Sequence, residues 1–345
     1  MSAISKIEWC DSTVNFWSGC TKVSAGCAHC YAETRDKRHM IEKVDHWGKG
    51  APRLKSKSAI KQALALNRQP WICDVCGGAS DRRFDHSCTG RPEDSRHTAN
   101  VPWHRRRIFS LSLGDWLDPE VPIEWLAEML DTIRQCDQVI WILCTKRPEL
   151  WSQRLRAVLD WDWEQDQQSR FSQGRAFHYW LCDWQAREIA PKNIWLLASV
   201  ENQDAANQRV PELLKIPAVV RGLSLEPLIG PVNIGLLRSP AGGRGYIDWL
   251  ILGGESGPGA QACNVSWIDS LISQGKAAGV ATLVKQLGSN CVTDNANLHD
   301  WPEDATLIGQ GEGFASARVK FKHSKGGDWN EWPEELRVRQ FPCDL

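Results

Sequence analysis

Three cysteines near the start of the chain are the residues best suited to carry chemistry. Cys20, Cys27 and Cys30 lie within FWSGCTKVSAGCAHCYAE, where their spacing is C-x6-C-x2-C. Closely spaced thiolates bind an iron–sulfur cluster or zinc. A [4Fe–4S] cluster held by three cysteines keeps one iron free for a non-protein ligand, whereas a structural zinc ion takes a fourth protein ligand. His29 and Cys10 are candidates for that ligand, so both kinds of site remain open alternatives.

A second group of cysteines falls in the polar stretch 67–100 and consists of Cys73, Cys76 and Cys88. The sequence C-D-V-C-G-G predicts a tight turn that presents two thiolates, as in a zinc-ribbon knuckle. Cys88 with His86 or His97 would complete four ligands. We interpret this group as a structural zinc site; an auxiliary iron–sulfur cluster and unmetallated thiols are the alternatives.

Short apolar runs recur along the chain and predict the strands that must position these cysteines. They occupy residues 107–115, 138–148, 193–202, 218–227, 248–256 and 281–288, with a first strand expected at 14–20. Nearly continuous apolar strands are typical of a buried parallel sheet. Helical patterns alternate with them, at 122–136 and at 266–279, where Ser266 is the expected N-cap. The alternation predicts an α/β fold, a partial (β/α) TIM-like barrel of about six to seven parallel strands.

The whole chain, residues 1–345, fits a single barrel domain with additions. Two stretches break the rhythm of strands and helices: the Cys-rich insertion at 67–100 and a second insertion at 160–192. The tail at 305–345 is Gly-rich and then charged. We expect this tail to pack on the barrel.

Composition indicates a globular protein of a reducing compartment. No run of about 18 apolar residues predicts a transmembrane helix, and the first residues lack the apolar segment of a signal peptide. Thirteen cysteines in such a chain favour metal ligation over disulfides. We therefore expect a cytoplasmic protein without a membrane partner.

Charged residues follow the predicted strands at or just beyond their carboxyl ends. They are Asp115, Lys146, Glu201, Glu226, Glu255 and Lys285. In a (β/α) barrel these ends converge on one rim, where catalytic and binding groups gather. Lys146, Lys285 and the neighbouring Arg147 could hold a carboxylate or a phosphate, and Asp115 could bind a ligand or orient one of the lysines. Salt bridges at the rim are the alternative reading.

Six segments together resemble a known family. They are KIEWCDSTVNFWSGCTKVSAGCAHCYAE, SLGDWLDPEVP, LCTKRPE, NIWLLASVENQ, RGLSLEPLIGPV and LILGGESGPGA. In these segments the chain resembles the phage-associated three-cysteine-motif family of poorly characterised proteins, which are similar to radical S-adenosylmethionine enzymes and distantly to spore photoproduct lyase. The usual superfamily spacing is C-x3-C-x2-C, so the first loop is longer here.

The resemblance implies a cofactor set and several residue roles. Cys20, Cys27 and Cys30 would hold a [4Fe–4S] cluster whose fourth iron S-adenosylmethionine chelates. An electron donor would then allow cleavage to a 5′-deoxyadenosyl radical. The element Gly253-Gly254-Glu255-Ser256 resembles the one that holds the methionine amino group. Glu201 and Glu226 would hold ribose hydroxyls or an ammonium group.

These observations favour a radical S-adenosylmethionine enzyme acting on nucleic acid or a nucleotide. The net charge is −1, so an affinity for nucleic acid would rest on local basic segments and on some of the 19 tryptophans. One alternative is a zinc-stabilised nucleic-acid- or protein-binding module without catalysis. Another is an enzyme that carries a different ligand at the open iron.

Overall fold

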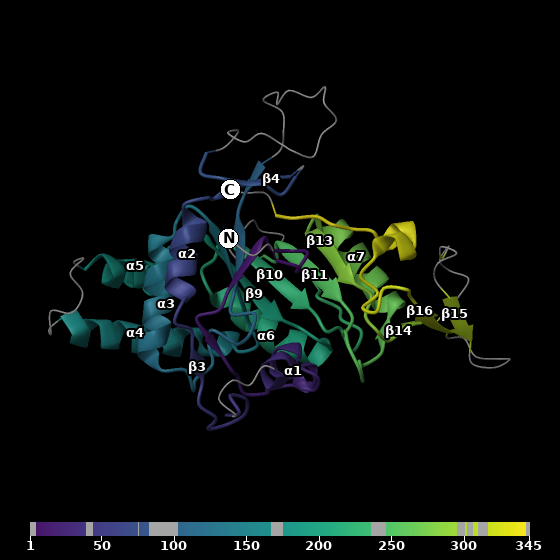
Figure 1. Ribbon diagram of the computed structural model, residues 1–345, viewed down its shortest axis with the longest axis horizontal. Helices are drawn as coiled ribbons and strands as arrows, with labels where there is room; N and C mark the ends of the chain where they lie inside the picture. Colours follow the sequence, from purple (N-terminus) through teal and green to yellow (C-terminus); the bar gives the residue numbers. More distant parts are fainter. Residues whose placement is uncertain are drawn as a thin grey trace.

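A curled parallel sheet is the centre of the molecule. The computed structural model describes residues 5–38, 44–74, 76–82, 103–166, 175–235, 246–294, 301, 306–309 and 317–342. Seven strands, all parallel, form one sheet in the order β1-β7-β8-β9-β10-β11-β13. Figure 1 labels four of them, β9, β10, β11 and β13, at the centre of the molecule. Their bounds are Ser12–Val14, Arg107–Ser110, Ile140–Thr145, Ile194–Ser199, Val220–Leu225, Trp249–Gly253 and Ala281–Gln286. This sheet confirms the predicted partial TIM-like barrel.

Both faces of the sheet are buried, which explains the nearly continuous apolar runs. Side chains alternate between the faces. On β8, Ile140 and Ile142 pack inside the half-barrel, whereas Trp141 and Leu143 pack outside, against the helices. Trp195 and Trp249 make an edge-on contact inside, with ring centroids 5.8 Å apart. A plug of large side chains therefore fills the inside of the half-barrel.

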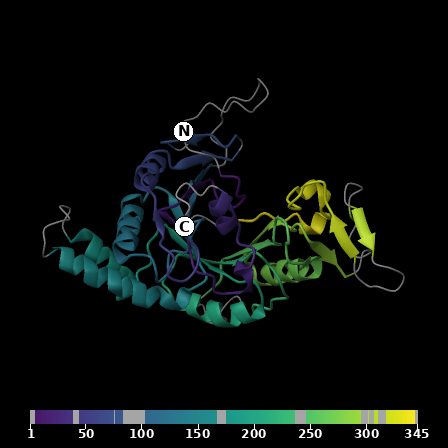
Figure 2. The same ribbon diagram turned by 60° about the horizontal axis from the view of Figure 1, so that its bottom comes forward.

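Helices cover the outer face of the sheet (Figure 2). The longer ones are α2 (Ala59–Asn67), α3 (Ile123–Gln135), α4 (Trp151–Asp166), α5 (Ala176–Gln185), α6 (Gln203–Lys215) and α7 (Val265–Ala278). The helix expected at 122–136 is α3. The helix expected at 266–279 begins one residue earlier, because Asn264 rather than Ser266 is the N-cap and accepts a hydrogen bond from the Ser266 backbone N–H. Gly279 ends it with φ 65°.

The first strand lies earlier in the chain than its apolar run indicates. β1 ends at Val14, because the chain then leaves the sheet, and the Asn15 side chain binds Ser112 Oγ and the Leu113 backbone N–H. The later part of the run forms β2 (Trp17–Ser18), which pairs with β3 (Leu54–Lys55). The chain then reaches the short helix η1 (Ala25–Cys27) and helix α1 (Tyr31–Arg38).

The stretches outside the βα rhythm form elements of their own. β4 (Trp71–Cys73), β5 (Ala79–Ser80) and β6 (Trp103–Arg105) make a three-stranded antiparallel sheet. Within 160–192, α5 buries Leu181 and Trp184 in the main core. No helix among the described residues combines the length and apolar character needed to cross a membrane.

The last part of the chain packs beside β13. A separate sheet with both parallel and antiparallel pairings is formed there by β12 (Cys263–Asn264), β14 (Cys291–Thr293), β16 (Ala317–Lys320) and β15 (Thr306–Gly309). Two short helices follow, η3 (Trp329–Glu331) and η4 (Glu334–Leu336). Val338 and Gln340 then exchange backbone hydrogen bonds with β13, so this segment lies along the edge strand of the half-barrel.

Candidate functional site

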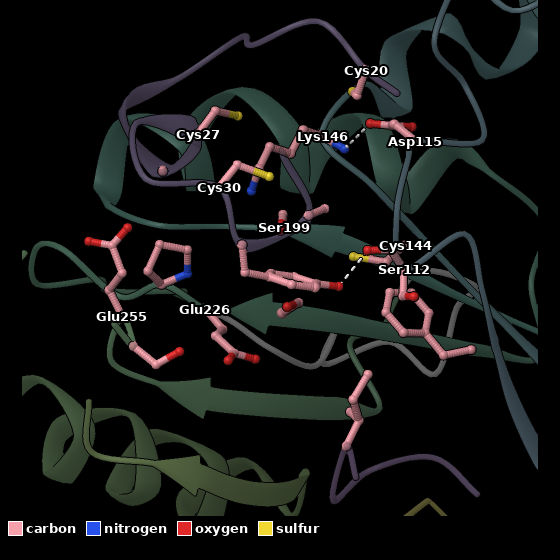
Figure 3. A pocket seen from close by; sticks show the side chains of 18 of the residues that line it. Cys20, Cys27, Cys30, Ser112, Asp115, Cys144, Lys146, Ser199, Glu226 and Glu255 are labelled. Atoms are coloured by element: carbon pink, nitrogen blue, oxygen red, sulfur yellow. Dashed lines mark hydrogen bonds between the residues drawn. The ribbon is translucent and has the colours of Figure 1, made fainter. Parts of the chain in front are cut away.

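A cavity of about 620 Å³ opens at the carboxyl ends of the barrel strands (Figure 3). Most of its lining comes from the N-terminal segment, the three-cysteine loop with the start of α1, the ends of β7 to β11, the end of β13 and the C-terminal tail. Small-molecule and cofactor sites fall within this range of volumes. The cavity therefore has room for an organic ligand.

Small and polar side chains on the strands create this space. Below the cavity, the inward positions carry Ile142, Leu197 and Trp195. The next inward positions on β8, β9 and β10 are Cys144, Ser199 and Ser224, and all three line the cavity. On β8 and β9 the inward side chains change from bulky to small at one level, which ends the apolar plug; with Ser224 of β10 they leave a floor of hydroxyls and a thiol.

The three predicted cluster ligands line this same cavity. Cys20 follows Gly19, whose φ of 105° and close approach to the His46 carbonyl exclude a side chain. Cys27 ends η1, and Cys30 directly precedes α1. Figure 3 shows the three sulfurs on the loop above the strands. The longer C-x6-C loop therefore still brings all three thiols to the lining of one cavity.

Burial favours the protonated form of two of the loop thiols, Cys20 and Cys30, by raising their pKa values. Burial raises the pKa of the Cys20 thiol to about 12, with Asp115 acting in the same direction and Arg147 against it. Burial also raises the pKa of Cys30, although the backbone amides of Glu33 and Ala32 at the start of α1 oppose this. Metal binding would displace these protons and replace them with a positive centre.

The donors around the cavity fit a cluster in their chemistry. Three thiols are the ligands that iron–sulfur clusters use. Among the described residues, no three His, Cys, Asp or Glu side chains come close enough to share one metal ion. The two candidates for a fourth zinc ligand have other partners: Cys10 lies in the inner core and donates to Ser5 Oγ, and His29 Nδ1 lies 3.2 Å from Glu255 Oε2.

The Arg147 guanidinium, which we expected to hold a carboxylate or a phosphate of a ligand, contacts the Cys20 thiol instead. Its Nη1 and Nη2 lie 3.5 and 3.6 Å from Cys20 Sγ, and Nη2 also donates to the Thr21 carbonyl. Asp115 accepts from Arg147 Nη1 at 2.8 Å, from Thr145 Oγ1 at 2.7 Å and from the Lys146 backbone N–H at 2.9 Å. Asp115 therefore orients an arginine, and its contact with Lys146 is to the backbone alone.

Glu201 supports the cysteine loop from below and does not line the cavity. It is 1% exposed, and Arg209 Nη1 donates to its Oε2 at 2.7 Å. Lys146 Nζ lies 3.9 Å from the same oxygen. A Cβ added at Gly26 would lie 3.1 Å from Glu201 Cδ, so the loop packs directly on this side chain. Burial acts to raise the pKa of Glu201, but the charge of Lys146, a hydrogen bond from Ser24 and the Arg209 guanidinium outweigh it and hold the pKa below its ordinary value.

Glu226 and Lys285 form an ion pair with each other. Both line the cavity, from the end of β10 and from β13, and Lys285 Nζ donates to Glu226 Oε1. Each side chain is less than one fifth exposed. The pair presents a carboxylate and an ammonium group side by side to any ligand.

The Gly-Gly-Glu-Ser element divides into a packing half and a cavity half. A Cβ added at Gly254 would lie 2.4 Å from the Leu287 carbonyl oxygen, so the chain after β13 requires a glycine there. Glu255 and Ser256 line the cavity, whereas Gly253 and Gly254 do not. Glu255 accepts the Gln261 backbone N–H at 2.7 Å on Oε2, the oxygen that also faces His29. The carboxylate thus lies against the cysteine loop.

Cys73 and Cys76 form a knuckle at the end of β4. The Gly77 and Gly78 backbone N–H groups donate to the Cys73 carbonyl at 2.8 Å and to Cys76 Sγ at 3.4 Å. Cys73 is fully buried beside Trp103. The remaining candidate ligands, Cys88, His86 and His97, lie outside the described residues.

A family model described as a protein of unknown function (DUF5131) matches residues 4–333. The chain belongs to this family. No curated protein and no solved structure matches the chain. Because the description of the DUF5131 family names no activity, a functional assignment has to come from the residues of the cavity.

Several functional residues of this DUF5131 chain carry no signal in the sequence. Arg53 lies among the basic residues of 49–57, which have the composition of a solvent-exposed stretch, yet its side chain is completely buried against Asp118. Arg53 Nη2 donates to Thr21 Oγ1 at 2.8 Å and so holds the cysteine loop from a second side. His323 and Lys325 reach the cavity from the tail. Only the alternation along the strands could have identified Cys144, Ser199 and Ser224.

Proposed function

We propose that this protein is a radical S-adenosylmethionine-type iron–sulfur enzyme that acts on nucleic acid or a nucleotide. The observation that carries the proposal is that Cys20, Cys27 and Cys30 line one cavity with room for an organic ligand. When bound, a reduced [4Fe–4S] cluster would supply the electron that cleaves S-adenosylmethionine to a 5′-deoxyadenosyl radical able to abstract hydrogen. The three thiolates would hold this cluster, and an electron donor would reduce it.

The other cavity residues would bind and orient the organic ligand. Both hydrogen bonds of the Glu255 carboxylate fall on Oε2. Within the described part of the chain, Oε1 is left without a partner and can accept an ammonium group, such as that of a methionine moiety. Glu226 and Lys285 offer an acceptor and a donor to ribose hydroxyls. The hydroxyls of Ser199 and Ser224 would offer further hydrogen-bonding groups to the ligand at the cavity floor.

Basic groups at the cavity mouth support an anionic substrate. Lys6, His323 and Lys325 are exposed and line the cavity. A phosphate-bearing substrate that approaches these groups would gain favourable electrostatic energy. Binding of a short duplex or of a nucleotide should therefore weaken steeply as salt rises. Absence of binding at low salt would remove this part of the proposal.

Anaerobic purification tests the cluster directly. We expect about four irons per chain, and an electron paramagnetic resonance signal of the reduced protein that changes when S-adenosylmethionine is added. The Cys27→Ala variant should lose the iron. Cys144→Ala is the matched control, because Cys144 is a fourth thiol of the same cavity outside the loop, and it should keep the iron. An iron-free wild-type protein with zinc in its place would refute the proposal.

We also propose that the knuckle at Cys73 and Cys76 holds a structural zinc ion. The backbone N–H group that points at Cys76 Sγ supports a thiolate there. Cys73→Ser should remove about one zinc per chain and leave the iron content unchanged. If that substitution lowered the iron content instead, the second cysteine group would belong to an iron–sulfur cluster. Zinc in both cysteine groups would favour a binding module without catalysis.

A further inference from the structure

Arg147 is a buried cation that binds one loop thiol and one carboxylate at once. It is 4% exposed and lies between Cys20 Sγ and Asp115 Oδ2. The other two thiols have different surroundings: Cys27 Sγ lies 3.9 Å from Ser24 Oγ, and Cys30 faces backbone amides. Among the described residues, Cys20 is thus the loop thiol that a side-chain cation contacts.

A fixed positive charge next to a ligating sulfur changes the redox properties of a cluster. N–H groups that donate to the sulfurs stabilise the reduced form, which carries one more negative charge, and so raise the reduction potential. Salt screens this effect weakly because the groups are buried. A carboxylate that partly neutralises the cation lowers the potential again.

Asp115 is held rigidly enough to act as that carboxylate. Thr145 Oγ1 and the backbone N–H groups of Leu117 and Lys146 donate to its two oxygens. These contacts fix Asp115, and Asp115 in turn fixes Arg147 against Cys20. Asp115, Arg147 and Cys20 therefore contact one another in series. The carboxylate partly neutralises the positive charge that the guanidinium places beside the thiol.

We propose that the Arg147–Asp115 pair sets the reduction potential of the cluster through Cys20, with Arg147 raising it and Asp115 lowering it. This inference rests on the proposed function, because it requires a cluster on the loop. Both residues act here as positioning residues, through a ligand of the cluster rather than on a substrate. The chain would in this way adjust how readily its electron donor can reduce the site.

The test is the midpoint potential of the bound cluster, measured without turnover. Anaerobic redox titrations of wild type, Arg147→Gln and Asp115→Asn would be followed by visible absorbance and electron paramagnetic resonance. We expect Arg147→Gln to lower the potential and Asp115→Asn to raise it. Each shift should amount to at least a tenfold change in the ratio of reduced to oxidised cluster, about 59 mV for a one-electron couple.

Arg53→Gln is the matched control for loosening of the loop. Arg53 is an equally buried, carboxylate-paired arginine that holds the same loop at Thr21 without touching a thiol. We expect its substitution to leave the potential near that of wild type. If Arg147→Gln fails to bind iron, Asp115→Asn decides alone.

The possible results separate this inference from the proposed function. Shifts of opposite sign would support it. Shifts of the same sign in both variants, or an unmoved potential in Asp115→Asn, would overturn the inference. The proposed function would still stand in that case if the wild-type cluster responded to S-adenosylmethionine. A wild-type protein that binds no iron would overturn both.

Discussion

Substitution of Gly254 by alanine tests whether a glycine is required at this position for packing or for ligand binding. The added Cβ would lie 2.4 Å from the Leu287 carbonyl oxygen and 2.9 Å from Cys263 Cβ. Since Cβ contacts under 3.0 Å essentially do not occur, the two chain segments must separate by about 0.6 Å. The atoms in the way belong mainly to backbone, which cannot rotate aside. We expect Gly254→Ala to lower the free energy of unfolding by about 2–3 kcal/mol, the upper range for overpacking.

Gly253→Ala is the matched comparison, because its added Cβ would lie 3.3 Å from the Gln286 carbonyl oxygen, within reach of a small adjustment. We expect it to cost less than about 1 kcal/mol. The assay is urea denaturation of both variants, with the midpoints compared at equal slope. S-adenosylmethionine affinity of the folded proteins would be measured in parallel. A Gly254→Ala protein as stable as wild type but defective in ligand binding would refute the packing explanation.

Two further substitutions test the cavity and the support of the loop. Ser224→Leu would fill the cavity floor and should weaken S-adenosylmethionine binding at least about tenfold, with the iron content unchanged. Equilibrium dialysis of the anaerobic protein would measure the affinity. An affinity equal to that of wild type would mean that the ligand lies elsewhere. Glu201→Gln should lower the free energy of unfolding by about 2 kcal/mol at pH 7. The pKa of Glu201 is depressed in the folded protein, so its carboxylate contributes stability above pH 4.5 that is lost as the pH falls below that value. Thermal unfolding across this range should show the two proteins converging in acid, and a constant difference would contradict the assignment.

The sequence predicts the sheet well because burial on both faces leaves a direct record in residue type. Runs such as 193–202 and 218–227 contain β9 and β10 with every residue buried. The first strand, β1, shares only one residue with the run at 14–20 that predicts it, because that run contributes residues to two different strands. Its Val14 closes β1, and its Trp17 begins β2, which lies outside the main sheet.

The partners of the charged rim residues could not be predicted from the sequence. The strand ends place Glu226 and Lys285 on one rim, but their pairing depends on side-chain reach across β11. Asp115 could equally have met Lys146 or Arg147, and only the turn after β8 decides that the guanidinium receives the carboxylate. Glycines are ambiguous for the same reason. Gly254 is required by a neighbouring backbone, which no spacing pattern records.

The tail beside β13 links two properties of the molecule that are usually independent. An open sheet offers its edge strand to other chains, and an uncovered edge invites aggregation. Here the Val338 carbonyl accepts a hydrogen bond from the Val284 backbone N–H, and the Gln340 backbone N–H donates to the Thr282 carbonyl. The tail therefore covers that edge. Upstream in the same tail, His323, Lys325 and Gly327 line the cavity. One piece of chain, residues 317–342, therefore contributes both to the wall of the cavity and to the cover that keeps the edge strand from pairing with other chains.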